Sequence, residues 1–416
     1  MTAGWATRSV AGVGAVVALT TSGCWWAQPG AGPGNTYHNG SESSLTLANV
    51  ATLEHAWSAP GSVSAVVDGK VVGVSDIPVV EVVARDVATG DELWSRALTP
   101  PGSVGGPTHP PVVAAGHVWA GYQAERLDGE CAFGLARLDL DSGTPVADDT
   151  TGAPSEIVPF GHQVALQTST YLPMPVGGGC WPEVPPGFRV VEGATAAPSW
   201  SATWSAGQIV VTGDRLFAVG GMLRSYVALG CGAATCAPAW SVSPGGLGGL
   251  SDLAGEGAGP LVATAATANP GETLVVAIDQ VTGAVTGSAT VPFTAYSLAL
   301  ADGTAYVAGE STVGGGESTV VAFDAASCAG TCVPLWMATL GGRAAAPDGL
   351  AVGGDVLYVG REDGAVEAYP ADGCAAATCA PVVEVATPGP VRSLAIASGR
   401  LFVGSESSVT AFAPGG

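Results

Sequence analysis

Residues 65–94 read AVVDGKVVGVSDIPVVEVVARDVATGDELW and contain three apolar runs, each separated from the next by a turn signal. The first turn contains Asp68-Gly69, a dipeptide that commonly joins two antiparallel strands. The run of residues 86–90, Asp-Val-Ala-Thr-Gly, predicts a second turn, in which the Asp side chain accepts hydrogen bonds from backbone amides. A fourth strand with Trp94 follows. The stretch therefore predicts one antiparallel sheet of four short strands.

The hairpin of this stretch can be read eight times along the chain. Apolar runs flank a turn glycine at intervals of 44 to 52 residues, which is the period of a four-stranded propeller blade. The high content of Gly (62) and Pro (30) also favours many short strands and turns. The turn glycines are Gly69, Gly116, Gly161, Gly213, Gly257, Gly303, Gly354 and Gly399.

The two ends of the chain predict how the ring closes. The last repeat supplies three strands, whereas residues 52–59 form a strand that has no hairpin of its own. Placing this early strand fourth in the last blade leaves no open sheet edge. We therefore predict an all-β fold, a single eight-bladed propeller of four-stranded antiparallel blades over residues 45–416. The tryptophans expected to dock neighbouring blades are Trp57, Trp94, Trp240 and Trp336.

The third-strand pattern of residues 84–94, Ala-x-Asp-x-x-Thr-Gly-x-x-x-Trp, resembles the tryptophan-docking repeat of the pyrroloquinoline quinone (PQQ) dehydrogenase-like β-propellers. Residues 44–58, SLTLANVATLEHAWS, resemble the segment by which that family enters its propeller. The resemblance covers about residues 35–413. It implies the fold but not one activity, because the same repeats serve dehydrogenases, assembly scaffolds and lipoproteins.

The N-terminus predicts export. Residues 1–23 combine Arg8 with a short apolar run and read as a signal peptide. The following TSGC, residues 21–24, resembles the lipobox of bacterial lipoproteins, which implies diacylation of Cys24. The alternative is an ordinary secretory signal cleaved near Ala27. With acylation, the protein is held on the cell membrane, faces the extracytoplasmic side, and residues 24–44 form a flexible tether.

Six cysteines form three close pairs at the turns between third and fourth strands. A zinc site needs about four ligands close together, and a redox dithiol needs a Cys-x-x-Cys spacing, so disulfides in an exported protein are the better explanation. The two remaining cysteines fall in long insertions of neighbouring blades, and we predict that they pair with each other. The predicted pairs are Cys231 with Cys236, Cys328 with Cys332, Cys374 with Cys379, and Cys131 with Cys180.

The same two insertions carry aromatic and charged residues, a mixture that suits a recognition surface on the face opposite the paired-cysteine turns. An equal alternative is that these side chains only cover one another. The candidate partner-binding residues are Tyr122, Arg126, Glu130, Tyr171, Trp181 and Glu183.

The net charge of −22, with Lys70 as the single lysine, argues against nucleic acid and anionic lipid surfaces as partners and favours a soluble monomer. Common hydrolase, metalloprotease, nucleotide-binding and EF-hand motifs are missing from the sequence. We predict no catalytic, cofactor-binding or metal-binding residue.

The family resemblance raises the question of enzymatic activity. It implies PQQ and Ca²⁺ beside a catalytic Asp, but the chain has no adjacent Cys-Cys, no Cys-x-x-Cys-His and no acid that the sequence assigns to the channel. We therefore predict a non-catalytic, lipid-anchored scaffold that binds an envelope protein, resembling in general plan the eight-bladed lipoprotein of outer-membrane protein assembly. The alternatives are a PQQ-dependent dehydrogenase of alcohols or sugars and a lipoprotein that binds cell-wall carbohydrate.

Overall fold

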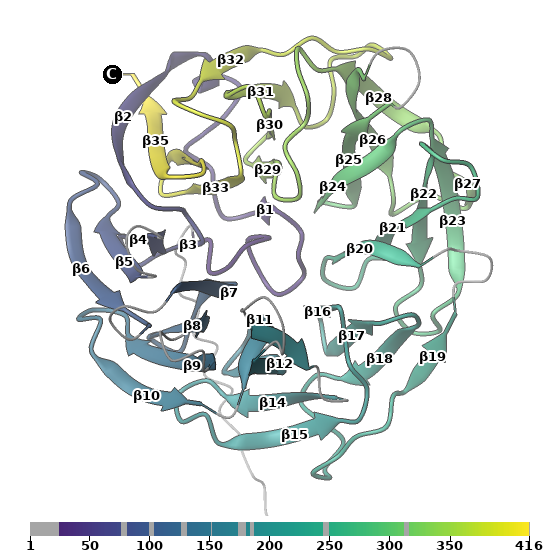
Figure 1. Cartoon of the computed structure of the whole chain (residues 1–416). Coiled ribbons are helices and arrows are strands. Elements are labelled where there is room, and N and C mark those ends of the chain that lie inside the picture. The colour runs from purple at the N-terminus through teal and green to yellow at the C-terminus, as the bar shows by residue number, and fades with distance from the viewer. Residues whose placement is uncertain are drawn as a thin grey trace, which may run out of the picture.

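The structure of the chain, a computed structural model, is a closed ring of eight antiparallel sheets (Figure 1). The prediction of an eight-bladed all-β propeller is confirmed. No helix in the described part of the chain is long and apolar enough to span a bilayer. The structure describes residues 25–75, 81–99, 104–125, 131–150, 152–173, 180–183, 187–243, 249–311 and 316–415, and for residues 104, 169–173 and 180–183 it describes the backbone alone.

Blades 1 to 4 each begin with an innermost strand and proceed outward along the chain. Blade 3 carries one extra strand, β13 (Cys180–Glu183), which extends the hairpin of the predicted insertion. The strands are β3 (Ala65–Val67), β4 (Lys70–Ser75), β5 (Glu81–Asp86) and β6 (Glu92–Ala97) in blade 1; β7 (Val104–Ala114), β8 (His117–Glu125), β9 (Cys131–Asp139) and β10 (Pro145–Asp149) in blade 2; β11 (Ala153–Phe160), β12 (Gln163–Pro173), β14 (Phe188–Glu192) and β15 (Pro198–Ala202) in blade 3; and β16 (Gln208–Thr212), β17 (Arg215–Val219), β18 (Leu223–Val227) and β19 (Trp240–Val242) in blade 4.

Blades 5 to 8 repeat the plan, and a short 3-10 helix, η1 (Val50–Thr52), precedes the closing strand. The strands are β20 (Leu250–Gly255), β21 (Leu261–Ala266), β22 (Thr273–Ile278) and β23 (Val285–Val291) in blade 5; β24 (Thr294–Ala301), β25 (Thr304–Glu310), β26 (Ser318–Asp324) and β28 (Pro334–Thr339) in blade 6; β29 (Leu350–Gly353), β30 (Val356–Gly360), β31 (Ala365–Pro370) and β32 (Val383–Ala386) in blade 7; and β33 (Ser393–Ala397), β34 (Arg400–Gly404), β35 (Ser408–Pro414) and β2 (Leu53–Pro60) in blade 8. Two short strands, β1 (His38–Asn39) and β27 (Gly330–Thr331), add to blades 7 and 5.

Ring closure follows the prediction from the chain ends. Strand β2 pairs antiparallel with the last strand β35, with Trp57 opposite Ala411. The purple start and the yellow end of the chain therefore share one sheet in Figure 1. This pairing satisfies the outer edge of β35 with a strand that lies more than 340 residues earlier in the chain.

The blade turns define two faces of the ring. Turns between first and second strands and between third and fourth strands lie on one side, here called the turn face; the other connections lie on the loop face. Gly69 illustrates the tight turn, with a φ of 73° that residues with a side chain rarely adopt. Because neighbouring blades bury both sides of an inner strand, the inner strand of blade 1, Ala65–Val67, is entirely apolar.

Five tryptophans from outer strands dock on the turn of the next blade. Trp200 Nε1, for example, donates to the Ala228 carbonyl at 3.1 Å, and a Cβ at Gly230 would lie 2.8 Å from the Trp200 ring. Glycine is thus required where the indole meets the turn. Trp57, Trp94, Trp240 and Trp336 make the equivalent bond to Val87, Leu140, Gln280 and Ala371. Sequence reasoning missed Trp200, which follows the blurred third repeat, where Glu192 stands in place of the Asp of the pattern.

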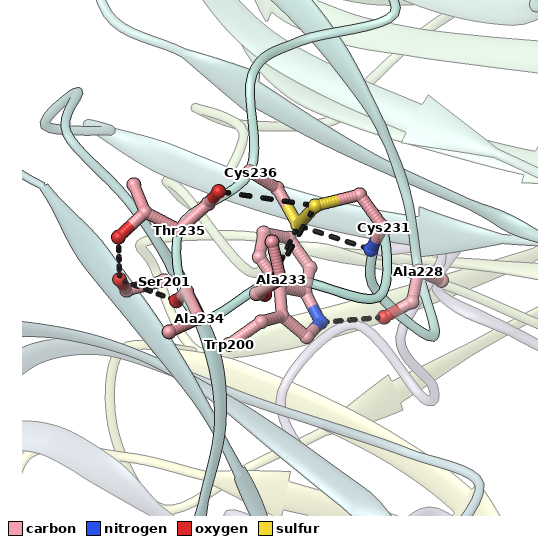
Figure 2. The surroundings of a disulfide bond; sticks show 8 residues. All are labelled: Trp200, Ser201, Ala228, Cys231, Ala233, Ala234, Thr235 and Cys236. Atoms are coloured by element: carbon pink, nitrogen blue, oxygen red, sulfur yellow. Dashed lines mark hydrogen bonds between the residues drawn. A yellow bond between two sulfur atoms is a disulfide. The ribbon is translucent and has the colours of Figure 1, made fainter.

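Disulfides close the outer turns of blades 4, 6 and 7, with Cα–Cα distances of 5.7, 5.1 and 5.7 Å. Each of these turns also pairs with the outer strand of the preceding blade. In blade 4, the Cys236 amide donates to the Ser201 carbonyl at 2.8 Å and the Ser201 amide to Ala234 at 2.9 Å. Figure 2 shows this turn beside Trp200. The disulfide turns therefore fasten one blade to the next.

The segment of residues 25–44 is packed inside the ring, so the prediction of a flexible tether is wrong for these residues. Trp26 is only 1% exposed and pairs with Val66, and β1 pairs with β29. Figure 1 shows this purple segment in the middle of the ring. The Gly- and Pro-rich composition indicated flexibility, but the ends of the inner strands supply hydrogen-bond partners that composition does not reveal. These partners are Val66, Val113, Val211, Gly255, Leu300, Val352 and Ile396.

Candidate ligand-binding cavity in the channel

A cavity of about 440 Å³ occupies the channel on its loop-face side. Its walls are the starts of inner strands, and residues Gln28, Asn35 and Tyr37 of the N-terminal segment also line it. Because that segment bonds to the opposite ends of the inner strands, it separates the cavity from the turn face. The volume lies in the range typical of small-molecule sites, roughly 300–1,000 Å³.

Among the described residues, three carboxyl groups line this cavity, one each from blades 3, 5 and 7. Glu156 comes from β11 in blade 3, Asp252 from β20 in blade 5, and Asp348 from the segment before β29 in blade 7. Each lies five or six residues before the hairpin glycine of its blade, and 96 residues separate successive members. The sequence analysis assigned no acid to the channel, whereas the structure places three there. This regular offset was the available sequence signal.

Burial perturbs all three acids in the same direction. It raises the pKa of Glu156 to about 8, with the negative charge of Asp252 adding to the effect. Burial also raises the pKa of Asp252 to about 6, although Gln208 Nε2 donates to its Oδ1 at 3.0 Å. The pKa of Asp348 is likewise raised by burial, and the Tyr37 hydroxyl donates to this carboxyl group.

The cavity offers no compensating positive side chain. None of the described residues that line it is a lysine or an arginine. Burial lowers the pKa of the lining residue His109 to about 4, so its ring is neutral at pH 7. Arg392 lines an adjoining hollow of about 270 Å³, which Asp348 also lines, but the ion pair of Arg392 is with Glu406 at 2.6 Å. The cavity is thus an acidic site with unbalanced charge.

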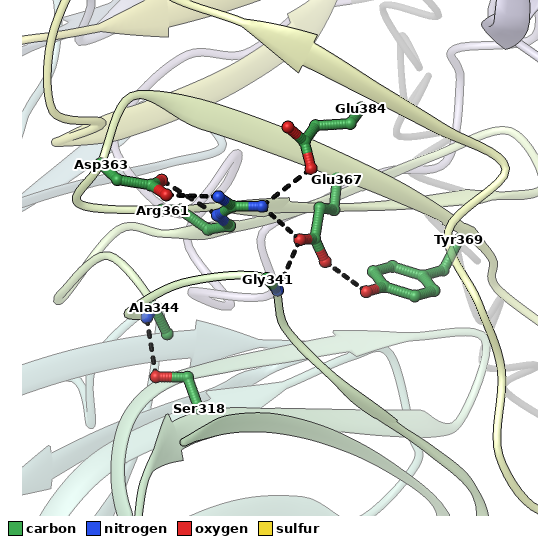
Figure 3. A network of polar contacts seen from close by, with 8 residues as sticks. All are labelled: Ser318, Gly341, Ala344, Arg361, Asp363, Glu367, Tyr369 and Glu384. Atoms are coloured by element: carbon green, nitrogen blue, oxygen red, sulfur yellow. Dashed lines mark hydrogen bonds and ion pairs between the residues drawn. The ribbon is translucent and has the colours of Figure 1, made fainter. Parts of the chain in front are cut away.

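A buried ion network supports the loop that carries Asp348 into the cavity (Figure 3). Arg361, only 7% exposed, bonds to Asp363, to Glu384 at 2.9 Å and to the buried Glu367 at 2.6 Å. Glu367 Oε1 in turn accepts from the Gly341 amide at 2.8 Å.

The rest of the loop is held from blade 6. Ser318 Oγ accepts from the Ala344 amide at 2.9 Å, and Ser297 Oγ donates to the Pro347 carbonyl at 2.6 Å. The wall of the cavity around Asp348 is therefore fixed in the folded chain by contacts from blades 6 and 7.

Solved structures share this architecture. The quinohemoprotein alcohol dehydrogenase from Comamonas testosteroni matches with a TM-score of 0.60 and 14% identity, over 94% of this chain and 80% of that chain. The quinohemoprotein alcohol dehydrogenase ADHIIG from Pseudomonas putida HK5 matches with a TM-score of 0.64 and 13% identity over the same shares. BamB from Moraxella catarrhalis matches with a TM-score of 0.55 and 16% identity, over 87% and 97%.

The fold is that of the PQQ-like eight-bladed propellers. At these identities, the likeness concerns the fold alone. No family model matches the chain, and no curated protein matches its sequence.

The cavity of this PQQ-like propeller does not fit PQQ. PQQ is a tricarboxylate, and the described lining residues would meet it with three carboxyl groups and no cationic side chain. A single calcium ion is not favoured either. In the described part of the chain, only His38, Glu256 and Asp302 place three ligand atoms within 4.8 Å of one another, and they lie at the turn face.

The structure tests part of the prediction that the two long insertions form a recognition surface. Tyr122 is 6% exposed and donates to Asp148 at 3.2 Å, so its side chain packs within blade 2 and the prediction is wrong for it. The backbone of Tyr171 pairs with Pro182, next to Trp181 and Glu183, in the β12–β13 hairpin, which lies against β8. Arg126, Glu130 and Cys24 lie outside the described residues. Cys131 is disulfide-bonded, and its pairing with Cys180 stays a prediction.

A second candidate surface is a set of exposed apolar side chains on blades 4 to 7, here called the apolar rim. Its members lie on outer strands or on the turns that lead into them, except Val227, which ends the third strand of blade 4. The most exposed is Val333, at 74%. Of the large exposed apolar side chains among the described residues, only Leu93, Val146 and Trp204 lie elsewhere. The apolar rim consists of Val227, Leu229, Val281, Val285, Val333, Leu335, Met337 and Val382.

Proposed function

We propose that the chain is a non-catalytic, lipid-anchored propeller of the cell envelope that binds a protein partner. The observation that carries the proposal is the apolar rim. Eight of the eleven large exposed apolar side chains among the described residues lie on blades 4 to 7, and an uneven concentration of exposed apolar surface favours a protein-binding side of the ring. The disulfides of blades 4, 6 and 7 support an oxidising, extracytoplasmic location of the protein. The poor fit of the cavity to PQQ argues against the dehydrogenase alternative.

Paired variants at equivalent blade positions test the partner-binding surface. Leu335 precedes Trp336 in blade 6 and is 49% exposed, whereas Leu93 precedes Trp94 in blade 1 and is 48% exposed. In envelope cross-linking followed by mass spectrometry, Leu335→Asp should lose the specific partner that the wild type recovers. Leu93→Asp introduces the same charge in the same local setting outside the rim and should retain it. Equal recovery with both variants would remove the apolar rim from the proposal.

The anchoring part of the proposal has its own geometry. Trp25 lines a hollow at the turn face together with Val67, Val113 and Phe160. A lipid on Cys24 would therefore be one residue away from the packed ring, a reach of about 4 Å. We expect the propeller to lie directly at the membrane through its turn face, with the channel cavity pointing away from the lipid.

Fractionation tests the anchor. The wild type should sediment with membranes and carry a thioether-linked glycerolipid on Cys24, whereas Cys24→Ala should appear in the soluble extracytoplasmic fraction. A mature N-terminus near Ala27 without lipid would support the ordinary secretory signal instead.

A further inference from the structure

The loop-face cavity concentrates negative charge at a cost to the folded protein. Glu156, Asp252 and Asp348 come from blades 3, 5 and 7 and lie in one cavity, with no lysine or arginine among its described lining residues. Burying carboxylates without a cationic partner opposes folding. Such an arrangement becomes favourable when a ligand supplies the missing positive charge.

A neutral hydrogen-bond acceptor in the cavity lining also favours a ligand that donates hydrogen bonds. Gln28 is 5% exposed, and its Nε2 donates to the Gly32 carbonyl at 2.8 Å. Its Oε1 is buried and has no hydrogen-bond partner, although Gln28 lines the cavity. A buried unpaired acceptor indicates that a donor belongs next to it. The cavity thus presents hydrogen-bond acceptors of two kinds, carboxylate and amide.

The spacing of these groups distinguishes between kinds of cation. Among the described residues, the three cavity acids do not form a set of ligand atoms within 4.8 Å of one another, so they do not converge on one metal ion. They are spread around a volume of about 440 Å³, which Tyr37 and Tyr296 also line. Separated carboxylates and aromatic rings suit an extended organic cation with several N–H donors.

We propose that this cavity binds an organic cation bearing primary ammonium groups, held by Asp252, Asp348 and Glu156 around the channel. The ammonium groups belong either to a free polyamine or to lysine side chains of a peptide, since both present the same donors. This site is separate from the apolar rim and does not depend on the binding of a protein there.

Calorimetric titration with two probes tests the proposal and identifies the source of the ammonium groups. Spermidine represents a free polyamine, and an acetylated, amidated tri-lysine peptide represents protein side chains. We expect at least one probe to bind the purified chain at low ionic strength. A preference for spermidine assigns the site to a small molecule, and a preference for the peptide assigns it to a basic protein segment. Failure of both probes to bind would overturn the proposal.

A matched pair of variants separates the cavity from the general negative charge of the surface. D252N/D348N removes two carboxyl groups from the cavity and should weaken binding on the order of tenfold or more. D141N/D214N removes two carboxyl groups whose side chains are 84% and 90% exposed, and it should bind like the wild type. Equal weakening by both pairs would show that the probes bind the surface, contrary to the proposal.

Thermal unfolding of the same variants shows whether a loss of binding is caused by misfolding. Because D252N/D348N removes buried charge, the melting temperature should be equal to or above that of the wild type. Partner recovery through the apolar rim should be unchanged in D252N/D348N, so the failure of one proposal is distinguishable from the failure of the other.

Discussion

Aspartates have opposite effects on the stability of the fold at the turn face and near the loop face. At the turn face, Asp279 accepts from the Thr282 amide at 2.7 Å, and these hydrogen bonds lower its pKa. Near the loop face, burial raises the pKa of Asp252. An aspartate thus stabilises the fold on one face and opposes it on the other.

This difference separates the region of the molecule that stabilises the fold from the region that forms a candidate ligand-binding site. Tryptophans, Asp turns and disulfides gather at the turn face. Trp336 bonds to the turn of the next blade, Asp279 accepts from an amide of its own turn, and Cys231 and Cys236 close theirs. Two of the cavity acids also accept hydrogen bonds, Asp252 from Gln208 and Asp348 from Tyr37, but the described lining residues include no lysine or arginine to offset the cost of burying their charge. Destabilising groups retained in a cavity are typical of functional sites.

The largest expected effect is the loss of a turn-face tryptophan. Trp336 is 2% exposed, stacks on Tyr369 at 6.0 Å and bonds to Ala371 at 3.4 Å. Trp336→Ala should lower the free energy of unfolding by about 3–5 kcal/mol. Trp204 lies in a loop-face connection, is 41% exposed and contacts Arg224, so Trp204→Ala should cost about 1 kcal/mol. Denaturant unfolding measures both, and similar losses would contradict the division between the faces.

The next effect is the loss of a disulfide turn. Replacing Cys231 and Cys236 with serine should lower the free energy of unfolding by about 2 kcal/mol, the chain-entropy value for so short a loop. The fold should persist, because the backbone bonds of this turn to Ser201 do not need the sulfur atoms. Urea midpoints with and without a reductant check this. If reduction does not change the urea midpoint of the wild type, the disulfides do not contribute to the stability of the turn face.

A smaller effect, of opposite sign, is expected in the cavity. The folded pKa of Asp252, about 6, lies above the ordinary value of 3.8, so ionisation costs the folded state stability as pH rises through this interval. Asp252→Asn keeps an acceptor oxygen for Gln208 and should be more stable than the wild type at pH 8 by about 1 kcal/mol. The difference should vanish near pH 2, where both the folded and the unfolded state carry a neutral acid. Melting temperatures of both proteins across this pH range measure the difference. A variant that is less stable than the wild type at pH 8 would contradict the claim that the ionised Asp252 destabilises the fold.

The smallest effect concerns a single Asp turn. The lowered pKa of Asp279 means that its contribution is present above the ordinary value and is lost as pH falls through the folded value. Asp279→Ala should therefore lower the free energy of unfolding by about 0.5–1 kcal/mol at pH 7 and by less at pH 2. Asp214, on a hairpin turn and 90% exposed, is the control, and Asp214→Ala should stay within about 0.5 kcal/mol. A pH-independent loss in the Asp279 variant would refute the capping explanation.

Much of the fold could be predicted because its signals are local. The recurring hairpin glycines predicted eight blades, and residues 52–59 predicted the closing strand that the structure places at Leu53–Pro60. The close cysteine pairs lie four or five residues apart, so each reports on its own turn. Trp200 escaped prediction because its turn departs from the repeat pattern.

The cavity could not be predicted in the same way. Asp348 sits in a loop whose path depends on contacts with Arg361 and Glu367 in blade 7 and with Ser318 in blade 6. The N-terminal segment also looked flexible, since its partners are the ends of inner strands far along the chain.

The amino-acid sequence by itself determined the blade repeat, the closure of the ring and the sites of its turn disulfides, because each depends on a short pattern or on the number of repeats. Only the tertiary structure decided that three acids spaced 96 residues apart meet in one cavity and that residues 25–44 close its far end. The physical reason is ring closure. It brings together the starts of inner strands that lie far apart in the sequence, and it buries their acids in a cavity whose described lining residues include no lysine or arginine.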